Sequence, residues 1–470
     1  MSGQARVRPR PPNPPARGRW ISHWNPEDET FWETTGRRVA RRNLVFSIAA
    51  QHVGFSVWLL WSVVVVSLPA AGFDFPTDQL LWLVATPNLV GALMRLPYTA
   101  AVARFGGRNW TTASAALLLL PVGLTAWCLT NPATPYWLFL VAAATAGLGG
   151  GNFASSMANI SYFYPDRAKG LALGVNAAGG NLGVAVVQLL TPLVVGVGVL
   201  GTAQASGLWL HNAPLLWLLP VLVATGCAWL FMDNLSVSRA SLREQSAGLR
   251  SKHTWIVSVL YLGTFGSFIG YSAAFPLLAV REFPALNGVS LAFLGPLVGS
   301  LSRPLGGWLS DRVGGARVTG WNFAGMAGGA LVVLVALDRH SYPLFLAAFL
   351  ALFVTSGIGN GSTYRMIPAI FRAEAQRAAR TDSSRPAETY LARGRLHSAV
   401  AIGISSAVGA FGGFVIPPGF GVSISLSGSI APALMLFVTG YAVFAAATWW
   451  FYLRRRVLVA RIPSLAYASI

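Results

Sequence analysis

Two arginines, Arg95 and Arg303, lie inside long apolar stretches of the sequence, where a charged side chain is costly. Each one ends a segment of the form Leu-Val-Gly-x-Leu-x-Arg, and the two segments are 208 residues apart. A guanidinium group can donate two parallel hydrogen bonds to an oxyanion, which the ammonium group of lysine cannot do. The pair therefore predicts a binding site for a small oxyanion.

The acidic residues of the sequence are not placed to neutralise these arginines. All 15 aspartate and glutamate residues fall in predicted tails, loops or helix ends. We interpret the missing negative charge as that of a substrate. The alternative is that helix-end carbonyl groups or water molecules satisfy each guanidinium group.

The depth of the two arginines follows from the residues after them. Arg104 and Arg312, each nine residues further on, belong to predicted loops. With a rise of about 1.5 Å per residue, each buried arginine lies roughly 13 Å from the end of its helix. The hydrocarbon layer is about 30 Å thick, so both arginines are expected near its middle.

The elements that carry these arginines are apolar blocks long enough to cross a membrane as helices. Hydrophobic residues make up 54% of the 470 residues and charged residues only 10%, which is too little charge to cover a soluble protein of this size. We predict an all-α membrane protein with twelve spans, at 44–68, 79–103, 110–129, 136–160, 169–196, 213–232, 254–280, 287–310, 317–337, 341–368, 397–418 and 430–453.

The net charge of +19 is distributed unevenly over the predicted loops. When the loops are assigned alternately to the two sides, one side carries only Arg281 and Arg339, whereas the other carries the remaining loop and tail arginines and lysines. The positive-inside rule makes the basic side, with both termini, cytoplasmic. The basic excess therefore orients the chain in a lipid bilayer and does not indicate a nucleic-acid partner.

A second repeated segment indicates a duplicated architecture. Gly147–Met157 and Gly357–Tyr364 share a glycine-rich pattern at an offset of 210 residues. Two related six-helix halves, at 44–232 and 254–453, with a substrate site between them are the expected result. The other segments are predicted to be an N-terminal tail (1–43), a central loop (233–253) and a C-terminal tail (454–470), all cytoplasmic.

Several of these motifs resemble those of a known family. Gly307–Gly315 resembles the motif between helices 8 and 9 of the major facilitator superfamily, whereas its N-terminal partner, Ala103–Arg108, lacks the aspartate. Residues 149–160 closely resemble the first nitrate signature of the nitrate/nitrite porter (NarK-like) family, and Gly357–Pro368 resembles the second. The resemblance covers nearly the whole chain. It implies the major facilitator fold, with two pseudo-symmetric six-helix halves, in a bacterial cytoplasmic membrane.

The resemblance also implies a substrate site in which Arg95 and Arg303 clamp the anion between aromatic rings. The matching positions are Phe55, Phe153, Asn181, Tyr261 and Phe265, and no residue of helix 11 can be assigned. Spacing places Phe268 on one helical face with the last two of these, and we interpret it as a packing residue. In the loop motif, Asp311 and Arg312 are expected to take part in gating.

Four glycines, Gly147, Gly151, Gly357 and Gly361, occur in pairs at four-residue spacing, which lets membrane helices approach closely. They do not indicate a phosphate-binding loop, because no strand precedes them.

Other polar residues within the spans leave more than one interpretation. Asn159, Asn176 and Gln188 could face the pathway or bond neighbouring helices. For His52 we favour a packed, hydrogen-bonded side chain over a proton carrier.

The resemblance implies transport of nitrate and nitrite, and the charge pattern favours exchange. Two facing guanidinium groups without an anion between them would be costly to enclose, and no buried carboxylate offers a proton relay. We therefore expect nitrate/nitrite antiport by a monomer without cofactor or metal. Nitrate–proton symport is the first alternative, and a nitrate receptor without transport is the second. An enzyme is not expected, because the spans contain no nucleophile–base or metal-ligand cluster.

Overall fold

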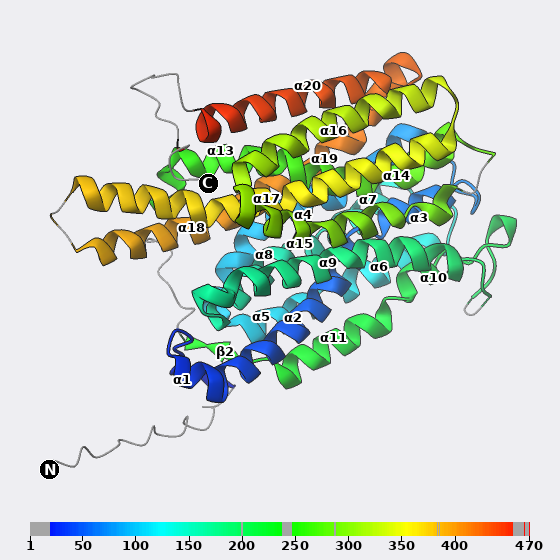
Figure 1. Ribbon diagram of the computed structural model, residues 1–470. Helices are drawn as coiled ribbons and strands as arrows, with labels where there is room; N and C mark the ends of the chain where they lie inside the picture. The colour runs from blue at the N-terminus through cyan, green and yellow to red at the C-terminus, as the bar shows by residue number, and fades with distance from the viewer. Residues whose placement is uncertain are drawn as a thin grey trace, which may run out of the picture.

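The computed structural model describes residues 19–198, 201–236, 247–285, 288–382, 384, 386–454, 465 and 470. Long helices run side by side along one direction (Figure 1). Residues 1–18, 237–246 and most of 455–470, which belong to the predicted tails and central loop, lie outside the described residues. The boundaries of those segments stay a prediction.

The N-terminal half contains six spans, of which four are divided into two elements by a short break. Its helices are α2 (Arg37–Trp58), α3 (Trp61–Ser67), α4 (Thr77–Phe105), α5 (Gly107–Ala116), α6 (Leu119–Leu129), α7 (Tyr136–Ala146), α8 (Leu148–Phe163), α9 (Asp166–Val194), α10 (Asn212–Leu215) and α11 (Leu218–Phe231). A short 3-10 turn, η2 (Ala205–Gly207), lies between α9 and α10.

The C-terminal half also contains six spans. Its elements are η4 (Ala247–Arg250), α13 (Lys252–Tyr261), the π-helical turn η5 (Leu262–Gly266), α14 (Ser267–Glu282), η6 (Gly288–Leu291), α15 (Leu294–Val313), α16 (Gly315–Asp338), α17 (Tyr342–Thr381), α18 (Ala387–Ala410), α19 (Gly412–Ser427), α20 (Ala431–Thr448) and the π-helical turn η7 (Trp449–Leu453).

Eleven helical segments among the described residues are long and apolar enough to cross a membrane. The predicted span outside this set is α15, which carries Arg303, Asp311 and Arg312 and is therefore less apolar. With 20 residues, α15 is still about 30 Å long, which matches the hydrocarbon layer. The twelve-helix arrangement is thus retained, and its least apolar member is one of the two that carry a buried arginine.

The two halves use their repeated glycines in the same way. Helix α8 packs on α4, and α17 packs on α15. A Cβ atom at Gly147 would lie 2.7 Å from the carbonyl oxygen of Pro87, and one at Gly357 would overlap the carbonyl oxygen of Gly299. Backbones can approach this closely only where no side chain intervenes.

The halves meet along helices that flank the centre of the molecule. α4 packs against α18 and α19, α9 packs against α15, and α3 packs against α14. The Nε2 of Gln188 donates hydrogen bonds to the backbone carbonyl of Ser272, at 2.7 Å, and to the hydroxyl of Ser62, at 3.0 Å. Gln188 therefore bonds neighbouring helices and joins the two halves near the C-terminal end of α9.

Residues 19–36, which fall within the predicted tail, pack on the N-terminal half. The strand β1 (Trp20–Ile21) pairs in parallel with β2 (Asn234–Leu235), and α1 (Glu29–Phe31) leads into the π-helical turn η1 (Trp32–Gly36). Trp24 lies 5.4 Å from Phe163, ring centre to ring centre, and both rings are buried. The short sheet is an addition to the predicted all-helical architecture.

The connection predicted at 369–396 is mostly helical. Helix α17 continues to Thr381 and α18 begins at Ala387, so the two form a hairpin that extends beyond the other helices (Figure 1). Alanine and arginine are the commonest residues of this stretch, and both favour helices.

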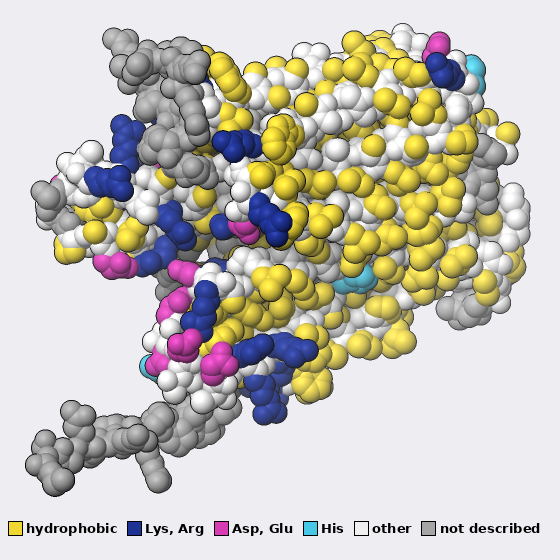
Figure 2. All heavy atoms as spheres, in the orientation of Figure 1, with side chains coloured by type: hydrophobic (Ala, Val, Ile, Leu, Met, Phe, Trp, Pro, Cys, Tyr) yellow, Lys and Arg dark blue, Asp and Glu magenta, His cyan; other side chains and the backbone are white. Residues whose placement is uncertain are grey.

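Figure 2 shows where charge lies on the outside of the protein. The visible face is largely hydrophobic, as expected for a surface in contact with lipid. Arginine, lysine and acidic side chains gather at the end that holds the α17–α18 hairpin and the N-terminal segment, which we call the basic end. A notch separates these two features at the basic end (Figure 2).

Candidate functional site

Arg95 lies near the middle of α4 and has 0% of its surface exposed. Its Nη1 donates a hydrogen bond to the backbone carbonyl of Ser406 in α18, at 2.6 Å, so the side chain connects the two halves. The guanidinium carbon lies 4.7 Å from the ring centre of Phe153, 5.0 Å from that of Phe265 and 5.4 Å from that of Trp58. Nε and Nη2 have no hydrogen-bond partner among the described residues. One edge of this guanidinium group is therefore free to bind a ligand.

Arg303 occupies the corresponding place in α15 and is 3% exposed. Its Nη2 donates a hydrogen bond to the hydroxyl of Tyr261, at 3.2 Å, while Nη1 has no partner within the described part of the chain. The guanidinium carbon lies 5.4 Å from the ring centre of Tyr364 and 5.7 Å from that of Phe153. The two arginines thus share one aromatic ring.

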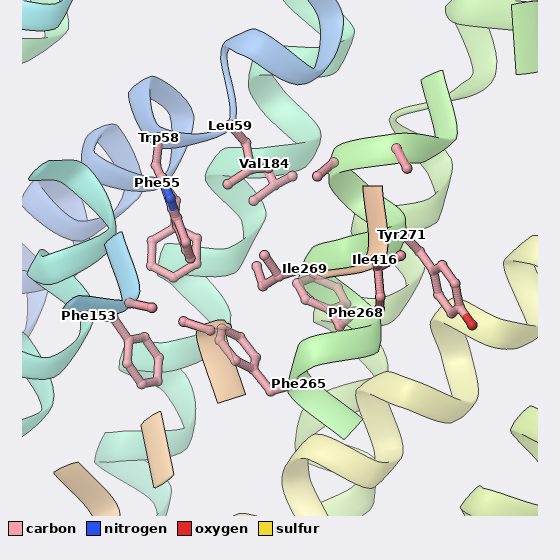
Figure 3. Packing of buried hydrophobic residues seen from close by; sticks show 14 of the residues in the cluster. Phe55, Trp58, Leu59, Phe153, Val184, Phe265, Phe268, Ile269, Tyr271 and Ile416 are labelled. Carbon is pink, nitrogen blue, oxygen red and sulfur yellow. The ribbon is translucent and has the colours of Figure 1, made fainter. Parts of the chain in front are cut away.

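Aromatic side chains from both halves surround the guanidinium groups. Figure 3 shows Phe55 and Phe153 of the N-terminal half close to Phe265 of the C-terminal half. The rings of Phe153 and Phe265 are nearly parallel, with centres 5.9 Å apart and an angle of 25° between planes. Tyr261 stacks on Phe265 at 5.2 Å, and Phe55 meets Phe153 edge-on at 6.0 Å. Ring faces stabilise neighbouring cations and form flat walls.

The site carries an uncompensated positive charge. Among the ion pairs of the described residues, none includes Arg95 or Arg303. The two guanidinium carbons, at 4.7 and 5.7 Å from the ring centre of Phe153, are at most about 10 Å apart, where an effective dielectric constant of about 20 gives a repulsion of roughly 2 kcal/mol. An anion bound between them would remove this repulsion. Free guanidinium donors between flat apolar walls suit a small, planar, monovalent oxyanion.

Comparison with known proteins agrees with this geometry. The family model of the Major Facilitator Superfamily matches residues 52–381. The nitrate/nitrite transporter NarU of Salmonella typhimurium is 42% identical over 93% of this chain and 96% of its own length. The chain belongs to the nitrate/nitrite porter family of this superfamily.

Two further proteins bear on the family and the fold. A probable nitrate/nitrite antiporter, NarK2 of Thermus thermophilus, is 40% identical over 76% of this chain and 84% of its own length. The crystal structure of a D-xylose–proton symporter matches with a TM-score of 0.60, over 86% of this chain and 97% of that protein. At 16% identity, this last similarity shows only the shared fold.

The superfamily motif that follows α15 forms an ion pair inside the C-terminal half of this porter. Asp311 pairs with Arg365 of α17 at 2.5 Å, and both side chains are about half exposed. Arg312 instead lies over the ring of Trp308, at 4.0 Å. At the offsets of 208 and 210 residues, the N-terminal half has Ala103 and Ser155 in place of this pair. The ion pair therefore has no counterpart in the other half.

The remaining predicted glycines lie beside the arginines of the porter. A Cβ atom at Gly151 would lie 2.7 Å from the ring of Tyr98, and one at Gly361 would overlap the backbone carbonyl of Arg303. Asn181 in α9 is buried, and neither atom of its amide has a partner among the described side chains and backbone groups.

Three residues beside the arginines were not predicted from the sequence. Trp58 follows Phe55 by one helical turn, and Tyr364 follows Gly361 by three residues, so helical spacing could have suggested both. Ser406 contributes its backbone carbonyl, for which the sequence offers no signal.

The other intramembrane polar residues have varied surroundings. His52 has its Nδ1 3.0 Å from the backbone carbonyl of Gly179, which is the packed arrangement expected for this side chain. Asn176 donates a hydrogen bond to Ser156 at 2.7 Å, whereas the Nδ2 of Asn159 has no partner in the described structure. The ring of Phe268 packs edge-on against that of Phe353, at 6.1 Å, and stacks on that of Phe265, at 6.3 Å, which agrees with its interpretation as a packing residue.

Proposed function

We propose that this protein exchanges nitrate and nitrite across a bacterial cytoplasmic membrane by alternating access. The supporting observation is the pair Arg95 and Arg303, both buried against the ring of Phe153 and without a carboxylate partner among the described residues. Two relatives carry nitrate and nitrite in their names, and one of them is called a probable antiporter. In this proposal Phe55, Tyr261, Phe265 and Asn181 complete the site.

The anion binds between the two guanidinium groups, which lie on opposite halves. Arginine forks can each donate two hydrogen bonds to a flat trigonal oxyanion. The ring faces of Phe153 and Phe265 bound the site on its flat sides and exclude anions that cannot lose their water. Nitrate and nitrite are weakly hydrated, so they are selected over chloride or phosphate.

Exchange follows from the charge of the empty site. Without an anion, closing the site on both sides encloses two unpaired positive charges, which are expensive in a medium of low dielectric constant. One bound anion reduces the site charge from +2 to +1 and allows the halves to close. The carrier therefore reorients loaded in both directions. By the positive-inside rule, the basic end faces the cytoplasm, and the notch in Figure 2 opens to that side.

Counterflow in proteoliposomes tests exchange against symport. Labelled nitrate uptake is measured into vesicles that contain either nitrite or chloride, at equal pH on both sides. Internal nitrite is expected to accelerate uptake strongly. Equal uptake into chloride-loaded vesicles, driven by an imposed pH gradient, would instead favour nitrate–proton symport.

A histidine variant and the wild-type flux address the remaining alternatives. His52 is the titratable side chain that symport would use, and its Nδ1 lies beside the carbonyl of Gly179. His52→Gln is expected to keep nitrite-driven nitrate uptake. Nitrate binding without any flux in the wild-type protein would favour a receptor.

A further inference from the structure

Gln51 is a buried side chain of α2 that nothing in the described structure satisfies. It is 1% exposed, and neither Nε2 nor Oε1 of its amide has a hydrogen-bond partner among the described residues. Buried amides are nearly always paired, because an unpaired one loses its bonds to water without replacement. Gln51 also precedes Phe55 by one helical turn, which places it next to the aromatic wall of the site.

The internal repeat assigns Gln51 a counterpart in the other half. An offset of 210 residues relates Phe55 to Phe265, and the same offset relates Gln51 to Tyr261. Both phenylalanines pack on Phe153, so both lie beside the same ring of the site. Tyr261 is the residue whose hydroxyl accepts a hydrogen bond from Arg303.

Packing against the fifth helix of each half supports this equivalence. A Cβ atom at Gly180 of α9 would overlap the amide of Gln51, and a Cβ atom at Gly409 of α18 would lie 2.6 Å from the ring of Tyr261. The two glycines are 229 residues apart. Each one therefore accommodates the side chain one turn before the site phenylalanine.

A second pair of glycines confirms the offset between these helices. Gly183 and Gly412 are also 229 residues apart. A Cβ atom at Gly183 would overlap the backbone of His52, and one at Gly412 would overlap the backbone of Gly266. The first and fifth helices of the two halves thus approach each other in the same way.

The N-terminal half gathers several unpaired polar groups around this position. Asn181 directly follows Gly180, and its amide also lacks a partner among the described residues. Arg95, the counterpart of Arg303, has Nε and Nη2 unpaired. In the C-terminal half the corresponding arginine is already bonded to Tyr261. Free donors thus lie on α2, α4 and α9, and in the C-terminal half the Nη1 of Arg303 and the hydroxyl of Tyr364 also lack a partner among the described residues.

We propose that Gln51 is a substrate-positioning residue, whose amide Nε2 donates a hydrogen bond to the bound nitrate or nitrite. It would act as the N-terminal counterpart of the Tyr261 hydroxyl, with Asn181 as a neighbouring amide donor. This inference rests on the proposed transport of these anions. It also gives the two halves different chemistry at corresponding positions. An amide has its donor and its acceptor on separate atoms, whereas a phenol combines both in one hydroxyl.

The test compares Gln51→Leu with Ser56→Ala, five residues further along α2. Ser56 is a matched control, because it is buried and its hydroxyl is bonded to the backbone carbonyl of Gly183, at 2.9 Å. Two quantities are measured on purified protein: the thermal unfolding temperature without nitrate, and the nitrate concentration that gives half of the maximal thermal stabilisation. The KM for nitrate counterflow is measured in parallel.

Gln51→Leu is expected to unfold at the wild-type temperature or above, because it removes an unpaired amide and keeps its volume. The half-stabilising nitrate concentration and the KM are expected to rise about tenfold, as for the loss of one hydrogen bond to a charged group. Ser56→Ala should leave both nitrate values unchanged. Gln51→Met repeats the measurement with an unbranched side chain should the leucine variant fail to fold.

Unchanged nitrate values in a folded Gln51 variant would overturn the inference. A lower unfolding temperature with an unchanged KM would overturn it as well, because it would show that Gln51 joins helices. Failure of the proposed function would look different, since wild-type protein would then show neither stabilisation by nitrate nor flux.

Discussion

Replacing each site arginine by lysine tests the guanidinium contacts to the anion, because the structure leaves both groups with donors that no described residue accepts. Arg95 keeps Nε and Nη2 free, and together these can hold two oxygens of one anion. Arg303 is bonded to Tyr261 through Nη2, and its Nη1 and Nε have no hydrogen-bond partner among the described residues. A lysine at either position retains the positive charge, but its ammonium group can replace only one of the two guanidinium donors to the anion. Each substitution should therefore lose one charge-assisted hydrogen bond to the anion. That bond contributes roughly 1.5–3 kcal/mol, or about 10- to 150-fold in nitrate affinity.

The assay is the nitrate dependence of thermal unfolding, with the KM of counterflow as a second measurement. Arg339→Lys provides the control, because Arg339 is an exposed residue at the end of α16. That variant should match the wild type in both measurements. Wild-type affinity in one site variant would refute a two-donor contact from that arginine. Wild-type affinity in both would remove the arginine pair from the binding site.

Two further substitutions test the packing and the ion pair. Gly357→Ala should destabilise the protein by roughly 1–3 kcal/mol, because the added methyl group overlaps the backbone of Gly299. Gly328→Ala is the control, because the space around Gly328 is open. It should be neutral or stabilise the protein by up to about 1 kcal/mol. Similar thermal unfolding temperatures for these two variants would contradict the packing argument. Asp311→Asn should lower the free energy of unfolding by about 1 kcal/mol or less, since its pair with Arg365 is half exposed. Chemical denaturation measures this free energy. A larger loss would contradict the expectation that a half-exposed ion pair contributes little to stability.

The parts of the structure that depend on local composition or on the internal repeat could be predicted from the sequence. A charged residue in an apolar block has few permitted surroundings, so the sequence alone identifies Arg95 and Arg303 as candidate binding residues, and the structure shows that both are buried. The shared Leu-Val-Gly-x-Leu-x-Arg segment relates α4 to α15. The twelve spans follow from apolar length, even though α15 is less apolar than the others.

Features that depend on contacts between distant segments could not be predicted. The bond from Arg95 to the carbonyl of Ser406 involves a backbone atom, which any residue could supply. The end of α17 from residue 369 and the start of α18 up to residue 396 lie outside the predicted spans, because hydropathy marks only the apolar part of a helix. Trp24 falls in a predicted tail, yet it is buried against Phe163, since its partner is distant in the sequence.

The bond between Arg95 and Ser406 connects anion binding to the motion of the two halves. It joins α4 of one half to α18 of the other at 2.6 Å, so a rocking motion that separates these helices has to break it. The released Nη1 would then lack a partner in apolar surroundings, which costs roughly 1.5–3 kcal/mol. An anion beside Arg95 can accept a hydrogen bond from that nitrogen, and it also reduces the repulsion between the guanidinium groups. Both effects lower the barrier to reorientation only when the site is occupied, which is the property that distinguishes an exchanger from a carrier that returns empty.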